Sequence, residues 1–247
     1  MPGQWRPHDA FEHIVWIRPP WEWADYVWLD FPEAIFADRG LLYLSHRSYK
    51  ARQLFDDLPG IEWQKIAGGL VVRRVLPNRV VFRAGIRAKS AISVALELTI
   101  ENGSEQLLSG IKVQVCAFLR AAKEFSEYTN ANKFVHTPGG GWVNLSEAAA
   151  CEGAEGSYRV GWRSGRPVLD LPVIVTLSSA AERLIAISWF GATYSMIGNP
   201  EHPCMHADPC FDNIEPGASQ TISGEILFFE GGLMAFEDYL SNGNFLE

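Results

Sequence analysis

The stretch that decides the fold spans residues 92–119. Residues 92–101 read ISVALELTIE, in which apolar and polar side chains alternate with the two-residue period of a half-buried β-strand. Residues 111–119 read IKVQVCAFL and have the same character, and Asn102-Gly103-Ser104 between them is a turn signal. We therefore predict two strands here, paired as an antiparallel hairpin.

Outward from this stretch, further short strands are predicted at residues 41–45, 70–76, 80–87, 173–177, 184–189 and 221–229. Helical periodicity is confined to residues 48–57 and 233–240. Many short strands separated by turns indicate an all-β fold, a large antiparallel β-sandwich with a few short helices. Neither a repeat nor a long linker divides the sequence, so we expect one domain over residues 1–247.

The composition excludes several classes of partner. Lysine and arginine total 21 against 29 aspartates and glutamates, which gives a net charge of -8 and argues against nucleic acid and anionic membranes. The apolar stretches are too short to cross a bilayer, and the first residues do not form a secretory signal. Cys204 and Cys210 could close a small loop, but reduced thiols and a cytoplasmic location are expected. The oligomeric state stays open.

Six aromatic side chains fall within residues 16–31, Trp28 among them. They could cover one end of the core, or they could form a stacking platform for a sugar ring. In the second interpretation, Asp25, Asp30 and Glu33 would accept hydrogen bonds from sugar hydroxyls. The sequence leaves both interpretations open.

The densest group of reactive side chains lies in residues 201–210, which read EHPCMHADPC. The reactive groups stand at every second position: His202, Cys204, His206, Asp208 and Cys210. In an extended segment they would project to one side, and imidazole, thiolate and carboxylate are the usual zinc ligands. However, Pro203 and Pro209 disfavour a ladder strand, and no second segment with metal-ligand spacing accompanies this one. We therefore expect a loop lining a cleft, in which His206 beside Asp208 acts as an acid or base.

Three further residues are candidates on probable loops. His136 precedes a glycine-rich stretch, and Tyr128 could donate its hydroxyl. Arg47, directly after the strand at residues 41–45, could clamp a carboxylate. Together these groups would suit a sugar with an acidic substituent.

The strand and turn at residues 94–104 resemble a unit of the galactose mutarotase-like (aldose epimerase-like) superfamily. Residues 215–229, which read EPGASQTISGEILFF, resemble the late turn and strand of the same sandwiches. The resemblance extends over residues 70–230 and implies a large twisted antiparallel supersandwich and a sugar substrate. Mutarotases place a histidine on the strand after the first turn, whereas Gln114 and Cys116 stand there in this chain. The resemblance therefore does not imply simple aldose epimerisation for this chain. The same fold also occurs in lyases, glycoside hydrolase domains and sugar-binding modules.

We accordingly expect a carbohydrate-active enzyme of the epimerase, lyase or hydrolase type that acts on a mono- or oligosaccharide. His202 or His206 would transfer the proton, Asp208 would orient its imidazole, and His136 would face the same hollow. Six residues are expected to contact the substrate: Arg47, Gln114, Tyr128, Trp28, Trp142 and Trp189.

No cofactor is expected, and no metal is assigned to the site. Two alternatives remain: a non-catalytic carbohydrate-binding protein that uses the same surface, and a metalloprotein that uses residues 202–210.

Overall fold

The computed structural model describes residues 2–3, 14–22, 26–45, 54–55, 58–137, 139, 141–150, 158–161, 169, 171–199, 201–243 and 245. Arg47, Asp25 and most of the helix predicted at residues 48–57 lie outside these ranges. Within the described part of the chain, no helix is long and apolar enough to cross a membrane.

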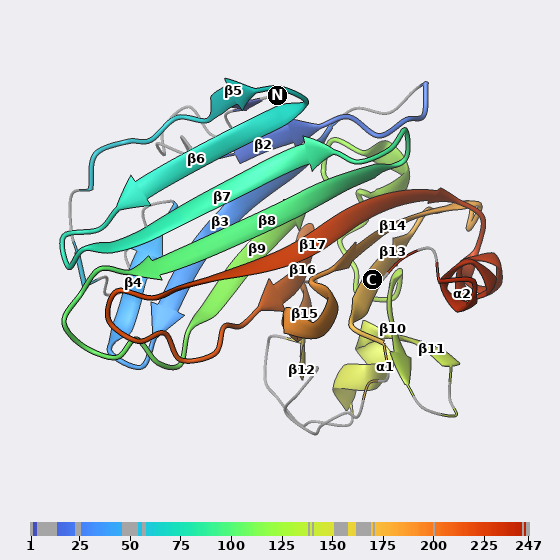
Figure 1. Cartoon of the computed structure of the whole chain (residues 1–247). Helices are drawn as coiled ribbons and strands as arrows, with labels where there is room; N and C mark the ends of the chain where they lie inside the picture. The colour runs from blue at the N-terminus through green and yellow to red at the C-terminus, as the bar shows by residue number, and fades with distance from the viewer. Residues whose placement is uncertain are drawn as a thin grey trace.

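Two antiparallel sheets make up most of the structure (Figure 1). The first sheet has eight strands, which lie in the order β1 (Pro2–Gly3), β2 (Ile14–Ile17), β3 (Val27–Ala37), β9 (Lys112–Phe118), β16 (His202–Pro209), β15 (Thr193–Asn199) and β12 (Tyr158–Gly161), with β4 (Gly40–Leu44) paired to β3. The second sheet has nine, in the order β11 (Gly141–Asn144), β10 (Lys133–Thr137), β13 (Val173–Leu177), β14 (Arg183–Ser188), β17 (Ser219–Glu230), β8 (Ser93–Asn102), β7 (Val80–Ala88), β6 (Gly69–Val75) and β5 (Gln64–Ile66).

Helical structure is sparse in the described chain. It comprises α1 (Leu145–Ala150), α2 (Leu233–Ser241) and the short 3₁₀ turns η1 (Lys123–Phe125) and η2 (Phe190–Ala192). The predicted all-β antiparallel sandwich with a few short helices is therefore confirmed, as is the helix at residues 233–240.

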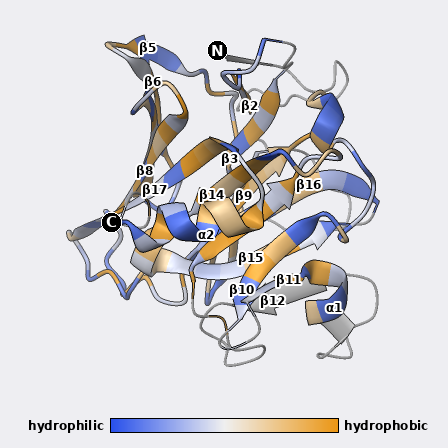
Figure 2. Ribbon diagram, turned by 90° about the vertical axis from the view of Figure 1, so that its right-hand side faces the viewer, coloured by the Kyte–Doolittle hydropathy of each residue, from blue (hydrophilic) through white to orange (hydrophobic). Residues whose placement is uncertain are grey.

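The main core lies between the sheets and is built by alternation along the strands. Leu96, Leu98 and Ile100 on β8 point inward, and the polar side chains between them point out. Figure 2 shows this as hydrophilic and hydrophobic bands along the strands. A second apolar cluster lies on the other face of the second sheet, where Phe236 of α2 packs over Val175 and Leu227.

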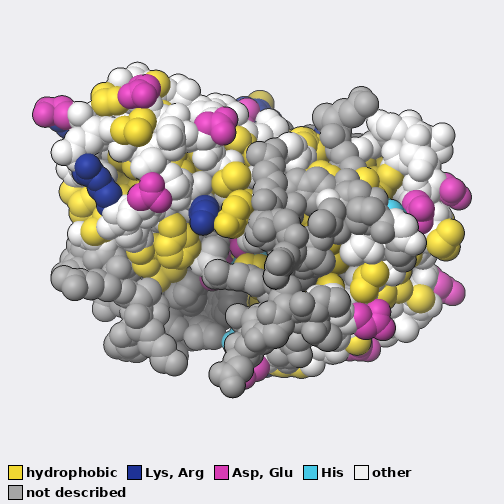
Figure 3. All heavy atoms as spheres, turned by 90° about the horizontal axis from the view of Figure 1, so that it is seen from below, with side chains coloured by type: hydrophobic (Ala, Val, Ile, Leu, Met, Phe, Trp, Pro, Cys, Tyr) yellow, Lys and Arg dark blue, Asp and Glu magenta, His cyan; other side chains and the backbone are white. Residues whose placement is uncertain are grey.

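The described surface seen from below carries scattered acidic and basic side chains among hydrophobic ones (Figure 3). This mixture agrees with the modest net charge of -8. On the described part of that face, acidic side chains outnumber basic ones.

The hairpin predicted within residues 92–119 is wrong, although both of its strands exist. β8 pairs with β7 and β17 in the second sheet, whereas β9 pairs with β3 and β16 in the first. The buried Asn102 explains the crossing. Its side-chain amide donates hydrogen bonds to the carbonyls of Gln106 and Ile214, each 2.8 Å long, and its Oδ1 accepts one from Ser104. The connection is thereby held as a crossover between the sheets.

The loop predicted at residues 201–210 is also wrong, because His202–Pro209 form the strand β16. Its prolines stand near the two ends, where a missing N–H does the ladder little harm. The pairing with β9 uses Cys204, Met205 and His206 between them, and the Pro203 carbonyl accepts a hydrogen bond from the Leu119 N–H.

Candidate functional site

The reactive side chains of β16 meet those of β9 and β3 on the outer face of the first sheet. Met205 and Ala207 point into the main core. Because side chains alternate along a strand, Cys204 and His206 point to the outer face. A small apolar cluster lies there, formed by Cys116, Phe118 and Cys204 with Trp28 packed against it.

Strand register brings these residues into two rows across the sheet. Asp30 of β3 lies opposite Cys116 of β9, which lies opposite His206 of β16. In the adjacent row, Trp28 lies opposite Phe118, and Phe118 opposite Cys204. Directly paired side chains are close enough to interact, so distant segments combine into one site.

We call Cys116, Cys204 and His206 the thiol–imidazole cluster. One ligand-type atom from each of the three lies within 4.8 Å of the others; Cys116 and Cys204 are buried, and the His206 side chain is 12% exposed. Cys116 and Cys204 carry free thiols, so the alternative of a disulfide between Cys204 and Cys210 is not realised.

Two carboxylates flank the imidazole. His206 Nδ1 lies 3.6 Å from Asp208 Oδ1 and 3.8 Å from Glu33 Oε2. Asp208 is held in place, because it accepts hydrogen bonds from the Val115 N–H and the Ser195 hydroxyl. Glu33 lies where the register between β3 and β9 shifts, between Asp30 and Ala34.

The thiol pair and the imidazole change one another's acidity. The hydrogen bond with Cys116 lowers the pKa of Cys204 to about 4; burial opposes this change, and His206 adds to it. The same hydrogen bond, together with burial, raises the pKa of Cys116 well above its usual value. Burial alone would lower the pKa of His206, but hydrogen bonds with Asp208 and Cys204 raise it overall. The cluster therefore favours a Cys204 thiolate beside a protonated His206.

Several predicted residues do join this face. His206 and Asp208 lie at its centre, and Trp28 borders it. His202 is exposed at the start of β16, with its ring 6.5 Å from that of Phe118. Gln114 lies two residues before Cys116 on β9 and is partly buried on the same side.

Four other predicted residues are not brought to this face. His136 and Trp142 contact each other on β10 and β11 of the second sheet, and His136 Nε2 lies 3.9 Å from Glu237 of α2. Trp189 is fully buried in the main core, and Tyr128 is 55% exposed after η1. The expected shared hollow for His136 and His206 is therefore not formed, since the two residues lie in different sheets.

Sequence reasoning did not identify Cys116 as a partner of His206. Cys116 was noted only as a replacement for the mutarotase histidine. The signal that identifies it is the pairing of β9 with β16, and this pairing joins segments about ninety residues apart in the sequence. No local pattern contains it.

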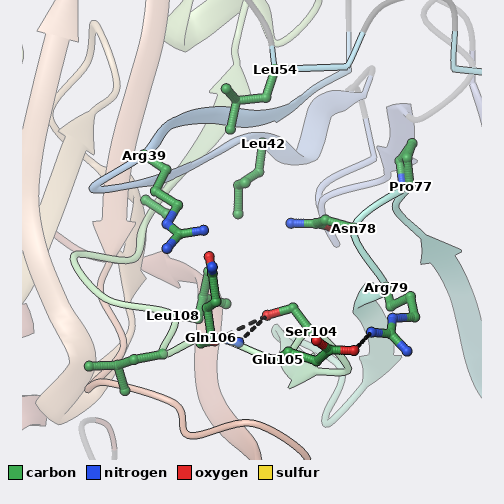
Figure 4. Close-up of a pocket in the computed structure, with 12 residues that line it drawn as sticks. Arg39, Leu42, Leu54, Pro77, Asn78, Arg79, Ser104, Glu105, Gln106 and Leu108 are labelled. Atoms are coloured by element: carbon green, nitrogen blue, oxygen red, sulfur yellow. Dashed lines mark hydrogen bonds and ion pairs between the residues drawn. The ribbon is translucent and has the colours of Figure 1, made fainter.

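A separate pocket of about 330 Å³ lies at one end of the sandwich (Figure 4). Arg39, Asn78 and Gln106 line it together with Leu42, and Arg79 is paired with Glu105 at its edge. Among the residues predicted for the site, none that the structure describes lines this pocket.

Comparison with known proteins gives matches among solved structures. Neither a protein-family model nor a curated protein matches the sequence. Among solved structures, the chain is similar to a protein from Synechocystis, with a TM-score of 0.46 and 11% identity over 83% of this chain and 78% of that one. It is also similar to a galactose mutarotase-like protein from Clostridium acetobutylicum, with a TM-score of 0.42 and 7% identity over 69% of this chain and 66% of that one.

A third similar structure is an aldose epimerase homologue from C. elegans, with a TM-score of 0.41 and 8% identity over 81% of this chain and 79% of that one. The galactose mutarotase-like resemblance stated from the sequence is thus found again among solved structures. Because the TM-scores are below 0.5, we base the function on the side chains of this chain alone.

Proposed function

We propose that this protein is a carbohydrate-active enzyme that binds a small sugar on the outer face of the first sheet and transfers a proton with His206. The observation that carries the proposal is the placement of the His206 imidazole between two carboxylates, 3.6 Å from Asp208 and 3.8 Å from Glu33. Histidine is the side chain that most often transfers a proton near neutral pH, and a neighbouring carboxylate shifts its pKa.

The two carboxylates suit different roles. The Asp208 side chain is only 6% exposed and holds hydrogen bonds from Val115 and Ser195, so it orients the imidazole. The side chains of His206 and Glu33 keep 12% and 18% exposure. These two are therefore the groups that can reach a substrate atom, one as the acid and the other as the base.

The surroundings of the imidazole fit a sugar. A sugar ring has apolar C–H faces and polar hydroxyl edges, so its site needs an apolar wall and a few placed polar groups. Trp28 and Phe118 lie side by side with ring centroids 5.7 Å apart. Gln114 and His202 add polar groups on the same face.

Turnover of a panel of aldoses and uronic acids, followed by NMR, tests this proposal. We expect His206→Gln and Glu33→Gln each to lower turnover by roughly 100-fold or more, the range for a lost proton-transfer group. Because both side chains are mostly buried, circular dichroism melts of each variant must show that it is folded before a loss of turnover is assigned to proton transfer. Glu97→Gln is the matched control: Glu97 pairs with Arg83 at 3.2 Å on the second sheet, and its loss should leave turnover unchanged.

Two results would count against the enzyme. Unchanged turnover in His206→Gln would remove the proton-transfer role. A wild-type chain that binds a sugar without converting it would instead support the alternative of a non-catalytic carbohydrate-binding protein.

A further inference from the structure

We propose that Cys116, Cys204 and His206 form a binding site for a zinc-type divalent cation. Two thiols and one imidazole converge within 4.8 Å on a buried patch of the first sheet, and thiolate with imidazole is a ligand set that zinc prefers. The metal alternative from the sequence took all its ligands from residues 202–210. The structure instead takes one from β9 and leaves out His202 and Cys210.

The strand geometry explains why these three residues converge. Cys204 and His206 are two residues apart on β16 and therefore point to the same face. Cys116 lies on β9 directly opposite His206. Two neighbours along a strand and one across it form a compact triangle on a rigid sheet, which is a better support for a metal than a loop.

The same register disfavours a disulfide between the two thiols. Because Cys116 pairs with His206 and Cys204 pairs with Phe118, the two cysteines are diagonal neighbours. Diagonal Cα atoms in an antiparallel pair lie about 7–8 Å apart, whereas a disulfide needs less than about 7 Å. A metal ion joins two sulfurs through two metal–sulfur bonds, which span a longer distance than one S–S bond. It can therefore bridge two cysteines that are diagonal neighbours.

The distances require only a small adjustment. With bonds of about 2.3 Å to sulfur and about 2.0 Å to nitrogen, a tetrahedral zinc ion holds its ligand atoms roughly 3.5–3.8 Å apart. The three atoms here lie within 4.8 Å of one another. To hold the ion, the ligand atoms would have to move up to about 1 Å closer together.

The surrounding charges also fit a cation. His206 Nδ1 faces Asp208 and Glu33, 3.6 and 3.8 Å away, so a metal on the other ring nitrogen would leave Nδ1 facing these carboxylates. Zinc-bound histidines almost always have such a partner. Asp30, 2% exposed and opposite Cys116, adds further negative charge. Three protein ligands leave a fourth position for water or an oxygen ligand.

This inference is separate from the proposed function, because it is measured by binding and not by turnover. The two are linked through His206. A bound ion occupies the imidazole that proton transfer needs, so we expect zinc-loaded protein to be inactive in the sugar assay.

Cobalt binding tests the site. The full chain is reduced with a phosphine, stripped of metal and titrated with Co²⁺ while its absorption spectrum is recorded. We expect one equivalent of Co²⁺ to give the intense bands of cobalt–thiolate bonds and the pattern of tetrahedral cobalt, and Zn²⁺ to displace it. Cys116→Ser and Cys204→Ser should each weaken binding at least tenfold and reduce the thiolate bands. Cys210→Ser, the matched control directly after the last residue of β16, should change neither.

Circular dichroism melts check that each variant is folded. If Cys204→Ser does not fold, Cys116→Ser alone decides, because it removes the ligand on the other strand. A folded wild-type chain without cobalt–thiolate bands would overturn the site, as would bands of equal strength in Cys116→Ser.

Discussion

At the scale of single residues, burial changes the chemistry of Lys133 most clearly. Its side chain is fully buried, and its ammonium donates hydrogen bonds to the Thr129 carbonyl and to Asn132 Oδ1. Burial lowers the pKa of Lys133 to about 8, while the charges of Cys204 and Glu127 act in the opposite direction. At neutral pH, the folded chain therefore holds the Lys133 side chain as a buried ammonium, and burying this charge costs free energy.

The sign of the pH effect follows from the lowered pKa of Lys133. Between pH 8 and about 10.4, the unfolded chain keeps this proton and the folded chain loses it, so the contribution of Lys133 to stability rises with pH. Lys133→Met removes the titrating group. We expect the stability of the wild type relative to this variant to increase by roughly 3 kcal/mol from pH 7 to pH 10.5, at 1.36 kcal/mol per pKa unit. Urea unfolding at several pH values measures the difference, and a difference independent of pH would contradict the assignment.

At the scale of the elements, β17 depends on a glycine at its centre. A Cβ at Gly224 would lie 2.6 Å from the Ser188 carbonyl oxygen and 2.8 Å from the Trp189 ring. β17 pairs with both β14 and β8, so neither neighbour can move away easily. We expect Gly224→Ala to lower the free energy of unfolding by about 1–3 kcal/mol, the usual cost of overpacking.

Gly85 on β7 offers a matched control for Gly224. A Cβ there would meet nothing closer than 3.8 Å, so Gly85→Ala should be neutral or slightly stabilising. Both variants are compared with the wild type by urea denaturation at equilibrium. Equal losses in the two variants would show that the close contact at Gly224 is not the cause.

At the scale of the whole molecule, Asn102 connects the two sheets. It is the last residue of β8, before the connection to β9. Its side-chain amide also donates a hydrogen bond to the Ile214 carbonyl in the segment before β17. Asn102→Ala would remove four hydrogen bonds, two donated to the Gln106 and Ile214 carbonyls and two accepted from Ser104, so we expect a loss of roughly 2–6 kcal/mol, at about 0.5–1.5 kcal/mol for each hydrogen bond. Asn78→Ala is the control, because the Asn78 side chain makes one local hydrogen bond to the Val80 N–H and should cost less than about 1 kcal/mol. Thermal unfolding of both variants checks this, and equal shifts would contradict a special role for Asn102.

The sequence alone determined several of the strands, such as those within residues 92–101 and 111–119, and the buried face of the first, but it did not predict β16 as a strand. Leu96, Leu98 and Ile100 show the reason, since a two-residue alternation is a local property of the chain. His202, Cys204, His206 and Asp208 share one side for the same reason. Local turn signals also predicted that the chain turns after Asn102. They did not predict that the following strand, β9, lies in the other sheet.

Only the tertiary structure decided which strands are neighbours. β8 and β9 are adjacent in the sequence and separate in space, whereas Cys116 and His206 are about ninety residues apart and directly paired. Strand pairing depends on how all the buried faces fit together, and on polar anchors such as Asn102 whose partners lie far along the chain. The candidate site is made of such pairings, so its reactive groups were visible in the sequence and their assembly was not.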